Sequence, residues 1–191
     1  LLLIFFVPSG GSAHSADSSG LAKYAPFVET SQTGMVAAAN EQASEAGAEM
    51  LRRGGNAVDA AVAASFAISV IRPQSTGIGG GGFLLLYLAN EQKTLAIDFR
   101  ERAPLKATRD MFVRDGKVVP SLSRAGPLAV AVPGVVAGLV EVQKRYGTLS
   151  LEEVMQPAIR LAEEGFRTYP HLARAIGYRA EMLGEYETTR E

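Results

Sequence analysis

The chain contains no cysteine, and its two histidines, His14 and His171, lie far apart in the sequence. The absence of cysteine excludes disulfide bonds, and two isolated histidines without neighbouring ligands do not form a typical zinc site. We therefore expect no metal and no redox chemistry of thiols. Any reaction must use hydroxyls, carboxylates, arginines or backbone groups.

An excess of charge of one sign is also missing. The sequence has 19 Lys+Arg and 20 Asp+Glu, which gives a formal net charge of -1. No basic run is long enough to bind a nucleic acid or an anionic lipid surface. With 191 residues, of which 47% are hydrophobic and 20% charged, the chain can bury a core and is expected to be one domain or most of one.

The chain has no apolar run long enough to cross a bilayer. It begins with a short apolar run, Leu1 to Val7, which is too short to span one. A segment rich in Ser, Gly and Asp follows, with a small-x-small cleavage site at 11–13. We interpret residues 1–30 as a signal-peptide remnant and a flexible segment, and 31–191 as the folded part. A periplasmic or secreted protein without a membrane span in its mature chain is expected. The alternative for the first residues is a buried strand.

Two helices are predicted early in the folded part. The segment 40–55 has apolar residues at helical spacing and ends in two glycines, which is typical of an amphipathic surface helix. The segment 57–71 follows a capping Asn56 and is apolar almost all round, so it should be buried. Asp59 stands at its third position, where a carboxylate stabilises the free amides and the positive end of the dipole.

A hairpin and an irregular segment come next. Residues 83–89 and 94–99 predict two strands, the first buried on both faces because it is continuously apolar, the second with Leu95, Ile97 and Phe99 on one face. The segment 101–134 is rich in turn residues and has a turn signal at 115–116.

Helices return in the last third of the chain. They are predicted at 134–147, at 150–165 and at about 170–183. The middle one begins with a capping box, Ser150 and Glu153, and carries Pro157 as a kink or break.

Five glycines occur within residues 77–82, in the sequence GIGGGG. A dinucleotide site would require a strand before the glycines and a helix after them, and the predicted order is the reverse. No Gly-Lys-Ser/Thr ending supports a phosphate loop either. Either a flexible connector or a tight crossing of backbones remains, and the entropic cost of about 0.5–1 kcal/mol per glycine favours the crossing. No cofactor is expected.

Arg100 is the most informative charge, because it emerges at the end of the second strand in 97-IDFRERAP-104. Arg100 or Arg102 could form a surface ion pair with Asp98 or Glu101, which contributes little. Alternatively, one arginine could bind a substrate carboxylate through two parallel hydrogen bonds. The residues alone leave both interpretations open, and they provide no complete catalytic set.

Five ordered motifs resemble one family. The segments 54-GGNAVDAAVA-63, 72-RPQSTGIGGGGF-83, 97-IDFRERAP-104, 107-ATRDMF-112 and 155-MQPAIRLAEEGF-166 are similar to the amino-terminal part of the gamma-glutamyltranspeptidase (glutathione hydrolase) large subunit. The resemblance implies an α+β fold, a partial αββα sandwich of the Ntn (N-terminal nucleophile) hydrolase type that lacks the small-subunit half.

The resemblance also implies an activity and partners. A precursor of this family cleaves itself into two subunits, and the new amino-terminal threonine of the small subunit attacks the gamma-glutamyl amide of glutathione. The glutamyl group then passes to water or to an amino acid or peptide. Arg100 matches the arginine that binds the alpha-carboxylate of the glutamyl group. No residue of this chain matches the nucleophile, so we expect a truncated enzyme that is inactive alone.

Two alternatives stay open. A cephalosporin or glutaryl acylase-like amidohydrolase would share the fold and act on another acyl group. A non-catalytic scaffold module would retain the fold without the nucleophile.

Overall fold

The computed structural model describes residues 3–5 and 31–190 of the chain. These residues divide into two compact units, Leu1–Gly77 with Val142–Glu191, and Ile78–Glu141. The signal-peptide interpretation of residues 1–30 lies outside the described residues, except for Leu3–Phe5. No helix in the described part of the chain is both long and apolar enough to span a membrane.

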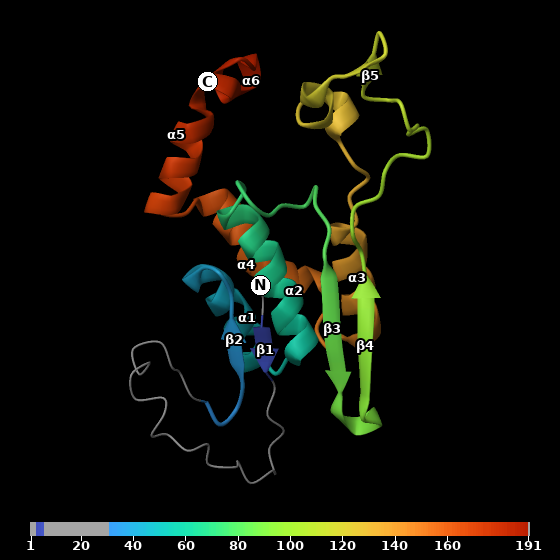
Figure 1. Cartoon of the computed structure of the whole chain (residues 1–191). Helices are drawn as coiled ribbons and strands as arrows, with labels where there is room; N and C mark the ends of the chain where they lie inside the picture. Colours follow the sequence, from blue (N-terminus) through green and yellow to red (C-terminus); the bar gives the residue numbers. More distant parts are fainter. Residues whose placement is uncertain (1–2, 6–30, 191) are drawn as a thin grey trace, which may run out of the picture. The chain divides into compact units, whose positions relative to one another are not determined.

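The first unit is built on two helices, α1 (Glu41–Arg52) and α2 (Ala57–Ile71), as the sequence predicts (Figure 1). The side chain of Asn40 caps α1 by accepting a hydrogen bond from the Gln42 amide at 2.9 Å. Asn56 caps α2 in a capping box, in which Asp59 accepts a bond from the Asn56 amide. These caps satisfy amides that the first turn of a helix leaves without partners.

The core of this unit lies around α2. Nine of the fifteen residues of α2 are buried, which confirms the prediction of an almost entirely apolar helix inside the fold. The largest fully buried side chains include Met50 of α1, Val62 and Ile71 of α2, and Val154 of the later helix α4. Burying one such side chain contributes about 1.5–3 kcal/mol.

Four further helices follow towards the carboxyl end: α3 (Val135–Tyr146), α4 (Leu151–Glu164), α5 (Pro170–Gly184) and α6 (Glu187–Arg190). The predicted capping box of Ser150 and Glu153 begins α4. Of the two alternatives predicted for Pro157, a kink or a break, the break is wrong, because α4 continues through this residue as one helix. Tyr169 ties the start of α5 to α2 by donating a hydrogen bond from its hydroxyl to the Ile71 carbonyl at 3.0 Å.

One short sheet belongs to the first unit. The strands β1 (Leu3–Phe5) and β2 (Met35–Ala37) pair antiparallel, with Leu3 opposite Ala37. The backbone of residues 3–5 is therefore a strand, the alternative that the sequence left open for this segment.

The second unit contains the predicted hairpin, β3 (Phe83–Leu88) and β4 (Lys93–Asp98), paired from Phe83–Asp98 to Leu88–Lys93 (Figure 1). On β4 the predicted alternation is confirmed, with Leu95 and Ile97 half-buried between exposed neighbours. The prediction that β3 is buried on both faces is wrong. The described residues of this unit cover only one face of the hairpin. The side chains of β3 on the other face are exposed, and these are Phe83, Leu85 and Tyr87.

The segment after the hairpin is irregular, as predicted. It contains the strands β5 (Val113–Arg114) and β6 (Lys117–Val118) and the short 3-10 helices η4 (Pro120–Ser123) and η5 (Pro127–Ala129). Asp115 and Gly116 connect β5 to β6, both with positive φ, 52° and 73°. Two residues of positive φ form the tight turn that matches the twist of a hairpin.

Candidate functional site

Arg100 lies just beyond β4, in a segment that hydrogen bonds hold on both sides. Phe99 pairs with Gly82, donating its amide to the Gly82 carbonyl at 3.1 Å and accepting from the Gly82 amide at 3.3 Å. Arg102 pairs in the same way with Val132, at 3.1 and 2.8 Å. The backbone of Arg100 therefore runs between the glycine segment and the segment that leads into α3.

Glycines make this close arrangement possible. A Cβ at Gly81 would stand 2.6 Å from both the Phe99 carbonyl oxygen and the Glu101 amide nitrogen. A Cβ at Gly134 would overlap the Phe99 carbonyl oxygen, and one at Gly138 would overlap the Phe99 ring. The predicted tight crossing is thus confirmed at Gly81, whereas a Cβ at Gly77 or Gly79 would meet nothing within 4 Å.

The phosphate-loop pattern has no binding geometry. The glycines lead directly into strand β3, so no helix begins after them. The Gly80 carbonyl instead accepts hydrogen bonds from the amides of Gly134 and Val135, each at 3.0 Å, at the start of α3. This carbonyl satisfies amides that a bound anion would otherwise engage.

The side chain of Arg100 is 58% exposed. Its Nε lies 3.3 Å from Oε2 of Glu101, and its guanidinium carbon lies 5.9 Å from the centre of the Phe83 ring. Asp98 does not pair with the guanidinium but accepts from the Arg100 amide at 2.9 Å. Within residues 3–5 and 31–190, no hydrogen bond joins the two Nη atoms to another group, so the planar end of the side chain is available to a ligand.

Asp59 is a polar centre of the first unit that the sequence prediction covered only in part. Its fully buried carboxylate accepts hydrogen bonds from the Asn56 amide at 2.6 Å, the Gln143 side chain at 2.6 Å, the Thr148 hydroxyl at 2.6 Å and the Leu149 amide at 3.0 Å. The capping role was predicted, but the three partners about 90 residues later were not. No periodicity in the sequence marks such a contact.

The protonation of Asp59 follows from these contacts. Burial raises the pKa of this carboxyl, but the hydrogen bonds from Thr148, Gln143 and the backbone outweigh burial and hold the pKa below its ordinary value. Asp59 is therefore a carboxylate that joins the start of α2 to the loop between α3 and α4. This role is structural, because every donor belongs to the fold.

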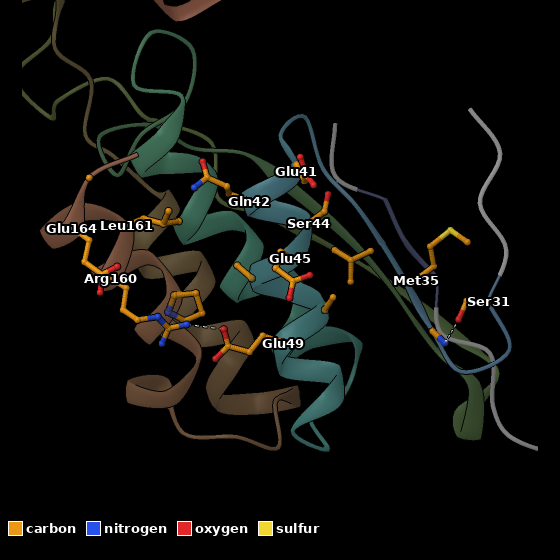
Figure 2. A pocket seen from close by; sticks show the side chains of 16 residues that line it. Ser31, Met35, Glu41, Gln42, Ser44, Glu45, Glu49, Arg160, Leu161 and Glu164 are labelled. Atoms are coloured by element: carbon orange, nitrogen blue, oxygen red, sulfur yellow. Dashed lines mark hydrogen bonds and ion pairs between the residues drawn. The ribbon is translucent and has the colours of Figure 1, made fainter. Parts of the chain in front are cut away.

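A groove of about 980 Å³ lies elsewhere in the first unit, along β2, α1 and α4 (Figure 2). Four glutamates line it, Glu41, Glu45, Glu49 and Glu164, together with Arg160. Arg160 donates to Glu49 at 2.6 Å, shown by a dashed line in Figure 2. Arg100 is not among its lining residues.

His171 and a carboxyl-terminal threonine pair are the other side chains that a search for catalytic groups must consider. His171 and the pair Thr188 and Thr189 are exposed, and the Thr189 hydroxyl donates to the Leu183 carbonyl at 2.7 Å. No cluster of three or more His, Cys, Asp or Glu in this part of the chain could hold a metal ion.

Comparisons with known proteins agree with the motifs. The family model of gamma-glutamyltranspeptidase matches residues 43–191. Glutathione hydrolase 3 of Arabidopsis thaliana is 46% identical over 156 residues, which is 82% of this chain and 24% of that protein. The crystal structure of Helicobacter pylori gamma-glutamyltranspeptidase superposes with a TM-score of 0.81 and 44% identity, over 85% of this chain and 46% of that one.

One of the similar structures is an acylase, the enzyme class of the alternative interpretation. Cephalosporin acylase from Bacillus halodurans superposes with a TM-score of 0.66 and 34% identity, over 75% of this chain and 26% of that one. The chain spans about a quarter of the length of the curated relatives that it matches. The predicted α+β fold, a part of the Ntn hydrolase fold, is confirmed, and the chain belongs to the gamma-glutamyltranspeptidase family.

Proposed function

We propose that this chain supplies the carboxylate-binding part of an enzyme that cleaves the gamma-glutamyl amide of glutathione. The observation that carries the proposal is the guanidinium of Arg100: its Nη atoms make no hydrogen bond within the described part of the chain, and its Nε lies 3.3 Å from Oε2 of Glu101 as an ion pair without hydrogen-bond geometry. In this arrangement the guanidinium presents two parallel N–H donors, which match the two oxygens of an alpha-carboxylate.

The chemistry requires a nucleophile outside the matched motifs. In the proposed reaction a threonine hydroxyl attacks the gamma-carbonyl carbon, the C–N bond breaks, and the leaving amine takes a proton. Water or an amino acid then attacks the ester that remains and releases the glutamyl group. Arg100 would contribute by fixing the other end of the substrate, so that the gamma-carbonyl meets the nucleophile in one orientation.

We propose further that the 191 residues alone do not catalyse this reaction. The motifs include no match to the nucleophile, and the relatives are about four times longer than the segment matched. The partner would be a small subunit released from the same precursor by self-cleavage. Electrophoresis of the purified complete gene product should show two chains, and a single uncleaved active chain would contradict this proposal.

The proposed location of the protein is the periplasm or the outside of the cell. We propose that residues 1–30 include the remainder of a secretory signal, since an apolar block and a small-x-small site precede the folded part. Amino-terminal sequencing of the mature protein tests this assignment. A mature chain that retains Leu1–Val7 would contradict it and would favour the strand β1 as a permanent part of the fold.

The test of function is Arg100→Lys in the complete gene product. A lysine keeps the charge but cannot form the two parallel bonds, so we expect the loss of one charge-assisted hydrogen bond, about 1.5–3 kcal/mol. The KM for a gamma-glutamyl p-nitroanilide should therefore rise about 10- to 100-fold. Arg102→Lys is the matched control in the same segment. An unchanged KM for Arg100→Lys, or a rise confined to Arg102→Lys, would refute the assignment.

The acylase remains a second candidate because of the superposition with cephalosporin acylase. Such an enzyme would release the side chain of a beta-lactam amide and would be indifferent to the alpha-carboxylate of a glutamyl group. Comparing hydrolysis of a gamma-glutamyl anilide with hydrolysis of a glutaryl beta-lactam decides between the two. A complete gene product that hydrolyses neither would favour the non-catalytic scaffold.

A further inference from the structure

We propose that Gly81 and Gly134 are positioning residues for Arg100, and that they fix its guanidinium by holding the peptide segment 99–101 from both sides. The inference rests on the proposed function of Arg100 and explains how the fold sets the direction of that side chain. It assigns an indirect role in substrate binding to two glycines, through their contacts with the backbone of residues 99–101.

Both glycines lie against the same carbonyl group, that of Phe99. The Phe99 carbonyl oxygen faces the α-carbons of both Gly81 and Gly134, so that a methyl group on either would be too close to it. A Cβ at Gly81 would also lie 2.9 Å from the Arg100 carbonyl carbon. The peptides on either side of the Arg100 α-carbon are therefore in contact with bare backbone.

Backbone hydrogen bonds hold the glycines and the segment 99–101 together. The Gly80 carbonyl accepts from the amides of Gly134 and Val135, both at 3.0 Å, which ties the two glycine segments to each other. The backbone pairs of Phe99 with Gly82 and of Arg102 with Val132 lie on either side of Arg100. These bonds restrict the φ and ψ angles of Arg100, so its backbone has little freedom to change direction.

The side chain of Arg100 itself has little support. It is 58% exposed, and the described residues give its guanidinium two contacts, the ion pair of Nε with Glu101 at 3.3 Å and the Phe83 ring at 5.9 Å. Exposed ion pairs and cation–π contacts are each weak. The direction of the guanidinium must therefore come largely from the backbone that carries it.

The size of the effect follows from the overlap at Gly81. Ordinary contact of a Cβ begins at 3.4 Å, so an added methyl at 2.6 Å requires the backbones to separate by about 0.8 Å. A displacement of about 1 Å can reduce a reaction rate about 100-fold when two groups must meet in fixed geometry. For a two-bond contact to a carboxylate, we expect a rise in KM of at least about 10-fold.

The experiment compares Gly81→Ala with Gly79→Ala in the complete gene product, with release of p-nitroaniline from a gamma-glutamyl anilide as the assay. Gly79 is the matched control, because a Cβ there meets nothing within 4 Å. We expect KM to rise about 10-fold or more for Gly81→Ala and to change less than about twofold for Gly79→Ala. Loss of folded protein alone lowers the maximal rate but leaves the KM of the active fraction unchanged.

A double-mutant cycle separates positioning from general damage. If Gly81 acts through Arg100, then adding Gly81→Ala to Arg100→Ala should change KM less than about twofold. If the rise in KM caused by Gly81→Ala were the same with and without Arg100, the proposal would be overturned. An Arg100→Ala variant with normal KM would refute the proposed function instead, so the two failures are distinguishable.

A milder variant applies if Gly81→Ala gives no active protein. The atoms nearest to a Cβ at Gly82 belong to the Phe99 ring, with Cε2 at 3.0 Å, so the enzyme should fold while Phe99, the first residue of the segment 99–101, shifts. We expect a KM rise of about threefold that again disappears in the Arg100→Ala background. An unchanged KM for Gly82→Ala in that case would overturn the proposal.

Discussion

Replacing Asp59 by asparagine is expected to lower the free energy of unfolding of the chain by about 3–6 kcal/mol. The change keeps the shape of the side chain and removes its charge. Because Asp59 is fully buried and every donor around it belongs to the fold, the loss falls on stability.

The magnitude follows from the donors on the two oxygens. Oδ1 accepts from the Gln143 side chain and from the amides of Thr148 and Leu149, while Oδ2 accepts from the Asn56 amide, the Thr148 hydroxyl and, at 3.2 Å, the Thr148 amide that it shares with Oδ1. An asparagine NH2 group must face one of these sets. Two bonds to a charged acceptor are then lost, and each contributes about 1.5–3 kcal/mol.

Urea unfolding followed by circular dichroism at pH 7 measures this difference. Asp115→Asn is the matched control, since the same change in the exposed turn between β5 and β6 should alter stability by less than about 0.5 kcal/mol. A loss below about 1 kcal/mol for Asp59→Asn would refute the conclusion that the carboxylate stabilises the fold by joining the start of α2 to the loop between α3 and α4.

The stabilisation by Asp59 should also depend on pH. The pKa of the folded carboxyl lies below its ordinary value, since the hydrogen bonds outweigh burial. The folded state therefore gains stability above the pKa of the unfolded chain, about 3.9, and loses it as the pH falls through the lower pKa of the folded protein. The wild type and Asp59→Asn should converge in stability in acid, and a difference that stays constant down to about pH 2 would contradict this assignment.

Two further substitutions test the packing and the turn. Met50→Ala removes a fully buried side chain of α1 and should cost about 2–5 kcal/mol in urea unfolding, whereas a cost below about 1 kcal/mol would show that this core can collapse around the cavity. Gly116→Ala should cost about 1–2 kcal/mol, because φ is 73° while no atom lies near the added methyl. A neutral Gly116→Ala would show that the turn of β5 and β6 relaxes to another conformation.

Local chemistry in the sequence predicted much of the fold. Asn56 with Asp59, and Ser150 with Glu153, mark the starts of α2 and α4 correctly, because capping depends on residues within one turn. The wrong predictions concern which residues from distant parts of the sequence cover each face of a helix or strand. Continuous apolar sequence in β3 predicted two covered faces, but coverage depends on residues far away in the chain, and Leu85 is 76% exposed.

The candidate site shows the same limit. The position of Arg100 at a strand end followed from the alternation of β4, and its proposed ligand follows from the family motif. The contacts of Gly134 and Gly138 with Phe99 could not be predicted, because nothing in local sequence tells which backbone will approach a glycine. The whole run 77–82 was predicted to lie at a crossing, which is correct for Gly81, whereas a Cβ at Gly79 would meet nothing within 4 Å.

The first unit is made of two separated stretches, Leu1–Gly77 and Val142–Glu191, with the second unit between them. During synthesis, α1 and α2 leave the ribosome long before α4, whose Val154 shares their core, and before Thr148, which binds Asp59. The part of the α2 surface that α4 covers therefore stays exposed while the inserted unit is made. At about 5–20 residues per second this interval lasts several seconds, and it is the period in which chaperones should bind the nascent chain.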